Sequence, residues 1–319
     1  MAPSSETVIG VDIGGTKTRI LEVPLDSRHD APVLDITVPT SSWRGGLGNA
    51  RRDADGLRAL LTRNVGAHAL DAALAAGVHG CDNTRQCQEL EEALRSRFAG
   101  PVVVVNDSEL LAPAMRHPEA INLVVGTGAI ATARSSDGRL MTSGGWGWLL
   151  GDEGSAPALV REASRAVLAE LDRGGESDPL ARRLMAAFAA RDAAEFALAV
   201  TVAASATAWG DHAPEVFLAA EEGSSLAAAV IQAAGEQLAL LVVQLRQRGI
   251  HTASAVAAGS VIERQPRLQD AVRAALARQQ PAIELLILDV PPVAGAAELA
   301  RRVAAQTTNH PNRTEKART

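Results

Sequence analysis

Two segments of the chain share one pattern: an apolar run, a glycine-rich turn and a second strand-like run. Val8–Val11 leads into Asp12-Ile13-Gly14-Gly15-Thr16, and Ile121–Val125, more than 100 residues later, leads into Gly126-Thr127-Gly128. Apolar runs of this length that end in glycine turns predict pairs of strands. Glycine lets backbone amides turn toward a ligand with no Cβ in the way, so each turn is a candidate phosphate site. Either turn taken alone also suits an ordinary hairpin.

The first half of the chain reads as mixed α/β. We expect strands at Val33–Val38 and Pro101–Val105, and a helix over Asp53–Leu61 with Asp53 as its N-cap. His68–His79 is rich in Ala and Leu and suits either a helix or a buried strand, because periodicity does not separate the two.

After Ser155 the sequence becomes mostly helical, with long Ala- and Leu-rich segments up to Arg248. Strand-like runs return at Ala255–Ala258 and Ile283–Leu288. A chain of 319 residues is long enough for two domains. We expect an N-terminal α/β domain (1–117), a C-terminal α/β domain with a large helical portion (118–305) and a flexible tail (306–319).

Composition narrows the function classes. Hydrophobic residues make up 47% and charged residues 21%, which is typical of a packed globular chain. The net charge of -6 argues against a general nucleic-acid binder. The two cysteines are too few for a disulfide framework or a four-thiolate metal site. We find no secretory signal and no uninterrupted apolar stretch of ~18 residues, so we expect a cytoplasmic protein without a membrane partner.

Asn106-Asp107 follows directly on the apolar run Pro101–Val105. A carboxylate at the end of a buried strand is partly desolvated and can act as a general base. The alternative is that Asp107 only caps a helix that begins near Ser108. Asp12 stands in the same position after the first apolar run, where a carboxylate can hold magnesium, often through water.

The stretch from Gly144 to Ser155 reads GGWGWLLGDEGS, with five glycines, two tryptophans and an acid pair in twelve residues. Each glycine costs ordering entropy, so such a loop suggests a function. An aromatic ring beside a carboxylate suits a sugar, because the ring packs on the C–H face while the acid accepts hydroxyl hydrogens. The alternative is a rigid surface loop that leads into the next helix.

The order of these motifs (DIGGTKT, ND, GTGAIA, GGWGWLLGDEGS and AAGSV) resembles the N-acetylglucosamine kinase and BadF-type ATPase family, within the sugar kinase, Hsp70 and actin fold group. The similarity runs from about Val8 to Ala305. It implies an α/β fold of two RNase H-like (actin/hexokinase-type) domains with a nucleotide and sugar cleft between them. It also implies ATP and Mg²⁺ as cofactors.

The resemblance assigns roles to individual residues. Asp107 is the expected catalytic base, and Asp12 is expected to position magnesium. The expected ATP-binding residues are Gly14, Gly15, Thr16, Lys17, Thr127, Gly128, Gly259 and Ser260. The expected sugar-site residues are Ser41, Asn106, Asp107, Ala129, Gly145, Trp146, Gly147 and Asp152.

Two positions depart from the family pattern. The loop that commonly carries a sugar-binding Asn reads Thr40-Ser41-Ser42-Trp43, and the usual Ser-Gly after the fourth strand is His79-Gly80. Both changes lie on the sugar side. We therefore expect ATP-dependent phosphorylation of the 6-hydroxyl of an amino sugar: N-acetylglucosamine first, with glucosamine or N-acetylmuramic acid as alternatives.

Two other functions stay open at this stage. One is a BadF-type ATPase that activates a reductase through a shared iron–sulfur cluster, for which one chain with two cysteines lacks four ligands. The other is a sugar-sensing protein without catalysis, since a fold does not fix a function. A homodimer is expected from the resemblance alone.

Overall fold

The computed structural model divides the chain into two compact units. Unit 1 contains Met1–Pro118 and Asp289–Thr319, and unit 2 contains Glu119–Leu288. The structure describes residues 6–26, 31–46, 48–174, 178–203 and 205–309. The C-terminal helix therefore groups with unit 1, whereas the sequence analysis placed residues up to 305 in the second domain. That helix continues to Asn309, into the segment expected to be a tail, and the rest of the tail lies outside the described residues.

Unit 1 is built on a five-stranded sheet with the order β3-β2-β1-β4-β5. The strands are β1 (Thr7–Ile13), β2 (Lys17–Pro24), β3 (Leu34–Pro39), β4 (Ala73–Val78) and β5 (Val102–Asn106). β1, β2 and β3 pair antiparallel in succession, and β1, β4 and β5 pair parallel. The interior strand β4 is buried at every residue, while the edge strand β3 alternates between half-buried and exposed residues. These two patterns are those of a two-sided core strand and an edge strand.

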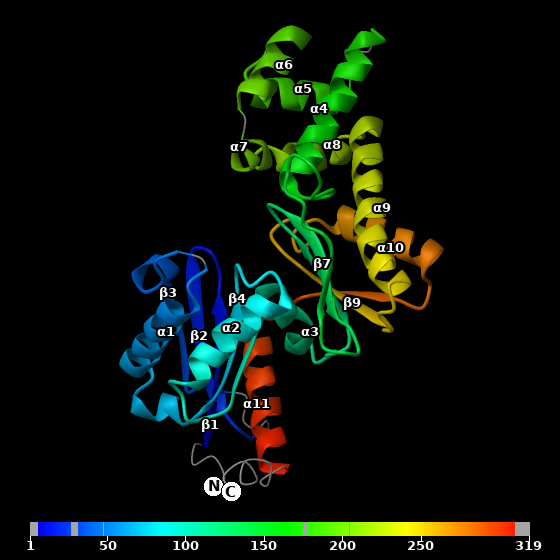
Figure 1. Cartoon of the computed structure of the whole chain (residues 1–319). Coiled ribbons are helices and arrows are strands. Elements are labelled where there is room, and N and C mark those ends of the chain that lie inside the picture. The colour runs from blue at the N-terminus through cyan, green and yellow to red at the C-terminus, as the bar shows by residue number, and fades with distance from the viewer. Residues whose placement is uncertain (1–5, 27–30, 47, 175–177, 204, 310–319) are drawn as a thin grey trace, which may run out of the picture. The chain divides into compact units, whose positions relative to one another are not determined.

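Helices cover both faces of this sheet, as Figure 1 shows for the C-terminal helix beside β1. They are α1 (Ala50–Asn64), α2 (Thr84–Arg95), α3 (Leu111–Ala114) and α11 (Val293–Asn309), with 3-10 turns at Thr40–Ser42, Ala67–Leu70 and Asp107–Leu110. α11 passes so close to β1 that a Cβ on Gly10 would lie 2.4 Å from the Ala297 nitrogen. Only glycine fits at that crossing.

The start of α1 differs from the sequence prediction. Its N-cap is Asn49, whose side chain accepts from the Arg52 nitrogen at 3.0 Å, and the helix begins before Asp53. Asp53 lies inside the first turn and pairs with Arg44 instead, with 2.8 Å between the Arg44 Nε and the Asp53 Oδ2. The Asp53 carboxylate, which the local pattern assigned to capping, thus binds Arg44 from the preceding loop.

Unit 2 has a second five-stranded sheet, with the order β10-β9-β6-β7-β8. Its strands are β6 (Ile121–Val125), β7 (Ala129–Arg134), β8 (Leu140–Gly144), β9 (Ser254–Ala258) and β10 (Glu284–Ile287). Counted within each unit, the two sheets have the same strand order and the same mixture of parallel and antiparallel pairs. In both, a glycine turn joins the first two strands, so the two candidate phosphate turns occupy equivalent places.

The large helical part of unit 2 packs on this sheet through one apolar core. The helices are α4 (Ala156–Asp172), α5 (Pro179–Ala187), α6 (Ala193–Val202), α7 (Ala206–Gly210), α8 (Ala213–Glu221), α9 (Ser225–Gln247) and α10 (Pro266–Gln279). Among the described helices, α9 alone has the length and apolar composition that could cross a membrane, and 56% of its apolar window is buried within the protein. A central core helix has this same composition.

Candidate functional site

The glycine turn of unit 1 is fixed by a chain of hydrogen bonds. The Gly14 nitrogen donates to the Lys17 carbonyl at 2.9 Å, which closes the turn between β1 and β2. The Thr40 hydroxyl donates to the Gly14 carbonyl at 2.9 Å and lies 2.9 Å from the Thr18 hydroxyl. The Trp43 Nε1 donates to Thr18 at 3.0 Å. The turn therefore has a preset shape, which lowers the entropy cost of binding a ligand there.

The predicted residues around this turn are accessible. Gly15, Thr16 and Lys17 are exposed at its tip. Ser41 is also exposed, on the 3-10 turn directly after Thr40. The structure therefore brings the glycine turn of unit 1 and the loop with Ser41 side by side through the Thr40 hydrogen bond.

Asn106, not Asp107, caps the turn that follows β5. The Asn106 side chain accepts from the Ser108 nitrogen at 3.0 Å, and the Glu109 carboxylate accepts from the Asn106 nitrogen at 2.9 Å, which forms a capping box. The Asn106 amide also donates to the Cys81 carbonyl at 3.1 Å. Asn106 is thus engaged within unit 1. The Asp107 Oδ1 also accepts from the Ser108 nitrogen at 3.0 Å, and the Asp107 side chain stays one-third exposed.

Asp12 lies at the end of β1, with Gly77 of β4 as its parallel neighbour. Burial raises the pKa of Asp12 to about 6, the negative charge of Asp107 adds to this, and Arg19 opposes it. No group of three His, Cys, Asp or Glu side chains in the described chain could hold a metal by itself. Magnesium usually takes only one or two carboxylates plus substrate phosphates, so Asp12 beside a phosphate turn fits a magnesium that arrives with a nucleotide.

The glycine turn of unit 2 is braced by two neighbouring segments. The Gly126 nitrogen donates to the Gly128 carbonyl, and the Ala156 nitrogen at the start of α4 donates to the Gly126 carbonyl, both at 2.9 Å. The Gly259–Ser260 turn packs against the same place: a Cβ on Gly259 would lie 2.4 Å from the Val125 carbonyl oxygen. The structure therefore brings together the predicted ATP-binding residues Thr127, Gly128, Gly259 and Ser260.

A pocket of about 310 Å³ opens beside this pair of turns. Its walls come from the turns, from the start of α4, from α7 and α8, and from the segment before α10. The lining residues are Thr127, Ala156, Thr207, Gly210, Asp211, Ala213, Pro214, Phe217, Ser260, Val261, Arg264 and Gln265. The sequence motifs assigned a role only to Thr127 and Ser260. Val261 belongs to the AAGSV motif without an assigned role, and the other nine residues lie in helical or connecting segments without a motif.

Asp152 connects the tryptophan loop to the unit 2 turn. It has a positive φ of 55°, its side chain is buried, and its carboxylate accepts from the Gly147 nitrogen at 3.3 Å. Burial raises the pKa of Asp152, and hydrogen bonds from the Ala129 and Gly147 backbone partly offset this. Gly145 and Gly147 also have positive φ, and Trp146 is 73% exposed. The predicted sugar-site residues of unit 2 are thus grouped around one buried carboxylate.

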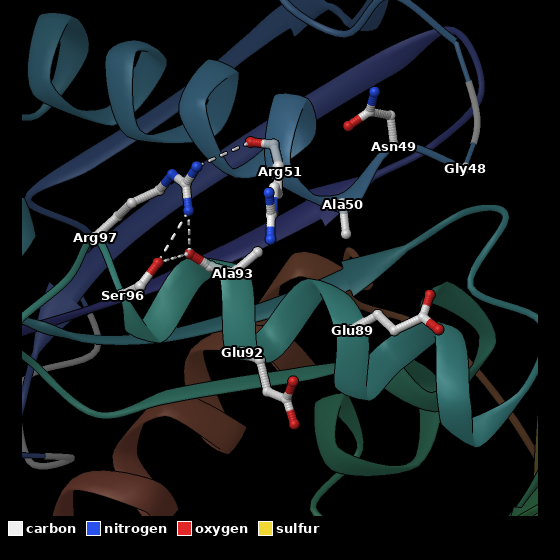
Figure 2. Close-up of a pocket in the computed structure, with 9 residues that line it drawn as sticks. All are labelled: Gly48, Asn49, Ala50, Arg51, Glu89, Glu92, Ala93, Ser96 and Arg97. Atoms are coloured by element: carbon white, nitrogen blue, oxygen red, sulfur yellow. Dashed lines mark hydrogen bonds between the residues drawn. The ribbon is translucent and has the colours of Figure 1, made fainter.

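A larger pocket of unit 1, about 490 Å³, lies between the start of α1 and α2 (Figure 2). It is lined by Gly48, Asn49, Ala50, Arg51, Glu89, Glu92, Ala93, Ser96 and Arg97. Arg97 spans it, donating to the Ala93 carbonyl at 2.7 Å and to the Arg51 carbonyl at 3.4 Å. None of the predicted site residues lines this pocket, so size alone does not mark the candidate site.

Comparison with known proteins identifies the family of this chain. Residues 9–300 match the BadF/BadG/BcrA/BcrD ATPase family. The chain belongs to this family. A curated relative, the N-acetylmuramic acid/N-acetylglucosamine kinase of Clostridium acetobutylicum, is 33% identical over 175 residues, which are 53% of this chain and 56% of the relative. The chain thus covers just over half the length of that relative.

Solved structures show the fold of this family member. A candidate N-acetylglucosamine kinase from Chromobacterium violaceum superposes with a TM-score of 0.64 at 23% identity, over 94% of this chain and all of the other. A ROK family glucokinase from Streptomyces griseus, solved with glucose and AMPPNP, gives 0.56 at 20% identity, over 94% and 99%. The α/β fold with two sheets is the actin/hexokinase-type fold that the sequence resemblance implied.

Proposed function

We propose that this protein is an ATP-dependent kinase that phosphorylates the 6-hydroxyl of an amino sugar, with N-acetylglucosamine as the first candidate. The observation that carries the proposal is the carboxylate of Asp107. Asn106 is the N-cap, Asp107 shares the Ser108 nitrogen with it through Oδ1, and the Asp107 side chain remains partly exposed with its charge acting on Asp12. The Clostridium relative, named as a kinase of two amino sugars, supports this substrate class.

In this proposal Asp107 accepts the proton of the sugar hydroxyl as the oxygen attacks the γ-phosphate. Phosphoryl transfer has a loose transition state, so the protein acts mainly by positioning and by neutralising charge. Gly14–Thr16 in unit 1 and Thr127–Gly128 in unit 2 supply backbone amides and hydroxyls for phosphates. The pocket beside Thr127 and Ser260 takes the nucleoside.

Asp12 is the side chain that would hold magnesium, which when bound neutralises phosphate charge. In unit 2, Asp152 is proposed to accept hydrogen bonds from sugar hydroxyls, beside Ala129, Gly145, Trp146 and Gly147. Ser41 is proposed as the sugar contact of the loop that follows β3. Asn106 contributes by holding the backbone from which Asp107 projects.

The cysteines do not favour the electron-transfer alternative. Cys81 and Cys87 are both buried in the unit 1 core, and the Cys87 thiol lies 3.5 Å from the Cys81 carbonyl oxygen. A cluster shared between two subunits needs thiolates at a surface. This burial supports the kinase proposal over the activator.

A sugar panel tests the proposal. Purified protein is incubated with ATP, magnesium and, one at a time, N-acetylglucosamine, N-acetylmuramic acid, glucosamine and glucose, and ADP is followed by a coupled assay. We expect ADP formation that depends on an amino sugar, and a 6-phosphate product by ³¹P–¹H NMR. ADP formation that no sugar stimulates would contradict the kinase and favour an ATPase. Sugar binding without ADP formation would favour a sensor.

A further inference from the structure

His79 stands at the end of β4, between the proposed base and the first phosphate turn. Its backbone nitrogen donates to the Ile13 carbonyl at 2.8 Å, which continues the pairing of β1 and β4. Its Nδ1 lies 3.5 Å from the Asp107 Oδ2. On the other edge of the ring, a Cβ on Gly15 would lie 3.6 Å from Cδ2 and 3.7 Å from Nε2. One edge of the imidazole therefore faces the carboxylate and the other faces the turn.

A buried ion pair holds the backbone of His79. The Arg44 Nη1 donates to the His79 carbonyl at 2.9 Å, and the Arg44 Nε donates to Asp53 at 2.8 Å. The Arg44 and Asp53 side chains are each only 5% exposed. Burying such a pair costs free energy unless its hydrogen bonds are well placed. Here the buried guanidinium also binds the His79 carbonyl and so restrains the backbone at that residue. This hydrogen bond fixes the position of the His79 backbone and therefore the point from which its side chain projects.

Charges around the ring favour its protonated form. The hydrogen bond to Asp107 is the largest influence raising the pKa of His79, and the negative charges of Asp107 and Asp82 add to it. Burial and the positive charge of Arg44 oppose this rise. The negative charge of Asp107 also acts on Asp12, and His79 is the basic side chain that pairs with Asp107.

This inference rests on the proposed kinase function. We propose that His79 is a positioning residue: its Nδ1–H holds Oδ2 of Asp107, while Oδ1 accepts from the Ser108 nitrogen at 3.0 Å and keeps a second lone pair for the acceptor hydroxyl. The Nε2 edge of the ring faces the phosphate turn. A carboxylate only accepts hydrogen bonds, so Nδ1 must carry the hydrogen. Because the same imidazole lies against both Asp107 and Gly15, a shift of the turn at Gly15 would also shift the position of Asp107. His79 thereby has a role in the position where the family usually has serine.

Three variants test the role. We expect His79→Ala to lower kcat roughly 10- to 100-fold, as for a lost orienting contact to a general base, with KM for ATP and for sugar within about twofold. His79→Asn keeps a donor near the same place and should recover part of kcat. The matched control is His68→Ala: His68 is also 51% exposed and pairs with a carboxylate, Glu22, at 2.8 Å, toward the other end of β2. Its kcat should equal that of the wild type.

An NMR titration reads the pair without turnover. The His79 imidazole should titrate above the range of an ordinary histidine in the wild type, and its pKa should fall in Asp107→Asn, where the neutral amide no longer favours the cation. An unchanged titration would overturn the pairing. If the wild type is an active kinase and His79→Ala keeps the full kcat, the positioning role of His79 is wrong while the proposed kinase function stands. A wild type without sugar-dependent ADP formation would instead contradict the proposed function.

Discussion

The two glycine turns have the same place in two sheets of the same strand order but different surroundings. Each is closed by one glycine nitrogen at 2.9 Å, from Gly14 in unit 1 and from Gly126 in unit 2. In unit 1 the fourth strand ends in His79-Gly80, and titratable side chains gather at the turn. In unit 2 it ends in Gly259-Ser260, and a pocket opens there. One scaffold thus presents a cluster of titratable side chains in one unit and a pocket of about 310 Å³ in the other, to which the proposed function assigns proton transfer and nucleoside binding.

The largest expected effect is on the titratable cluster of unit 1, at the proposed base Asp107. Asp107→Asn should lower kcat by about 10²–10⁴, the usual contribution of a general base, with a modest change in sugar affinity. Asp55→Asn is the control, because Asp55 is an exposed carboxylate of the same unit that pairs with Arg97. Steady-state kinetics with saturating ATP measure the effect. Near-normal turnover in Asp107→Asn removes Asp107 from the role of base.

The next effect concerns Asp12 and stability. The pKa of the Asp12 carboxyl is 3.8 in the unfolded chain and about 6 in the folded protein. Its contribution to the free energy of unfolding therefore falls as pH rises from about 4 to about 6. Asp12→Asn removes that fall and should raise the free energy of unfolding at pH 7 by about 3 kcal/mol, while kinase activity drops. Urea denaturation at pH 4 and pH 7 measures this. A variant that is less stable than the wild type at pH 7 contradicts the burial of the charge.

The turn at Gly15 after β1 and the turn at Gly259 after β9 should also differ in how they tolerate a Cβ. Gly259 has a φ of 119° and no room beside the Val125 carbonyl, so Gly259→Ala should cost about 2–4 kcal/mol of stability. Gly15→Ala meets only the His79 ring at 3.6 Å and should cost less than about 1 kcal/mol. Thermal unfolding compares the two. Equal losses would mean that the turns are not braced differently.

The smallest expected effect sharpens the assignment of the pocket. Thr207 is exposed on α7 and lines the pocket beside Thr127, so Thr207→Trp fills the space at low cost to folding. We expect KM for ATP to rise about tenfold, equivalent to ~1.4 kcal/mol, with KM for sugar unchanged. Gln232→Trp is the control, because Gln232 is exposed and lines a pocket of about 390 Å³ between α9 and α10 of the same unit. If KM for ATP rises equally in both variants, the nucleoside does not bind beside Thr127.

Local pattern predicted the strands and turns but not their partners. The run Pro101–Val105 was expected as a buried strand, and Val102–Val105 lies in β5, because consecutive β-branched valines suit a strand that is covered on both faces. The segment His68–His79 was ambiguous, and it contains the end of a 3-10 turn and then β4. Pairing with β1 and β5 decided this, and periodicity carries no information about such neighbours.

The sequence by itself determined the two glycine turns, the strands that lead into them and the acids at the strand ends, because these depend on residues adjacent in the chain; β4 is the strand it left open. Only the tertiary structure decided that Arg44 pairs with Asp53 and reaches the His79 carbonyl, and that α11 returns to the sheet of unit 1. The contacts of Arg44 with His79 and of α11 with β1 join residues far apart in sequence. Their selection depends on packing and on the pairing of buried charges, which no local pattern records.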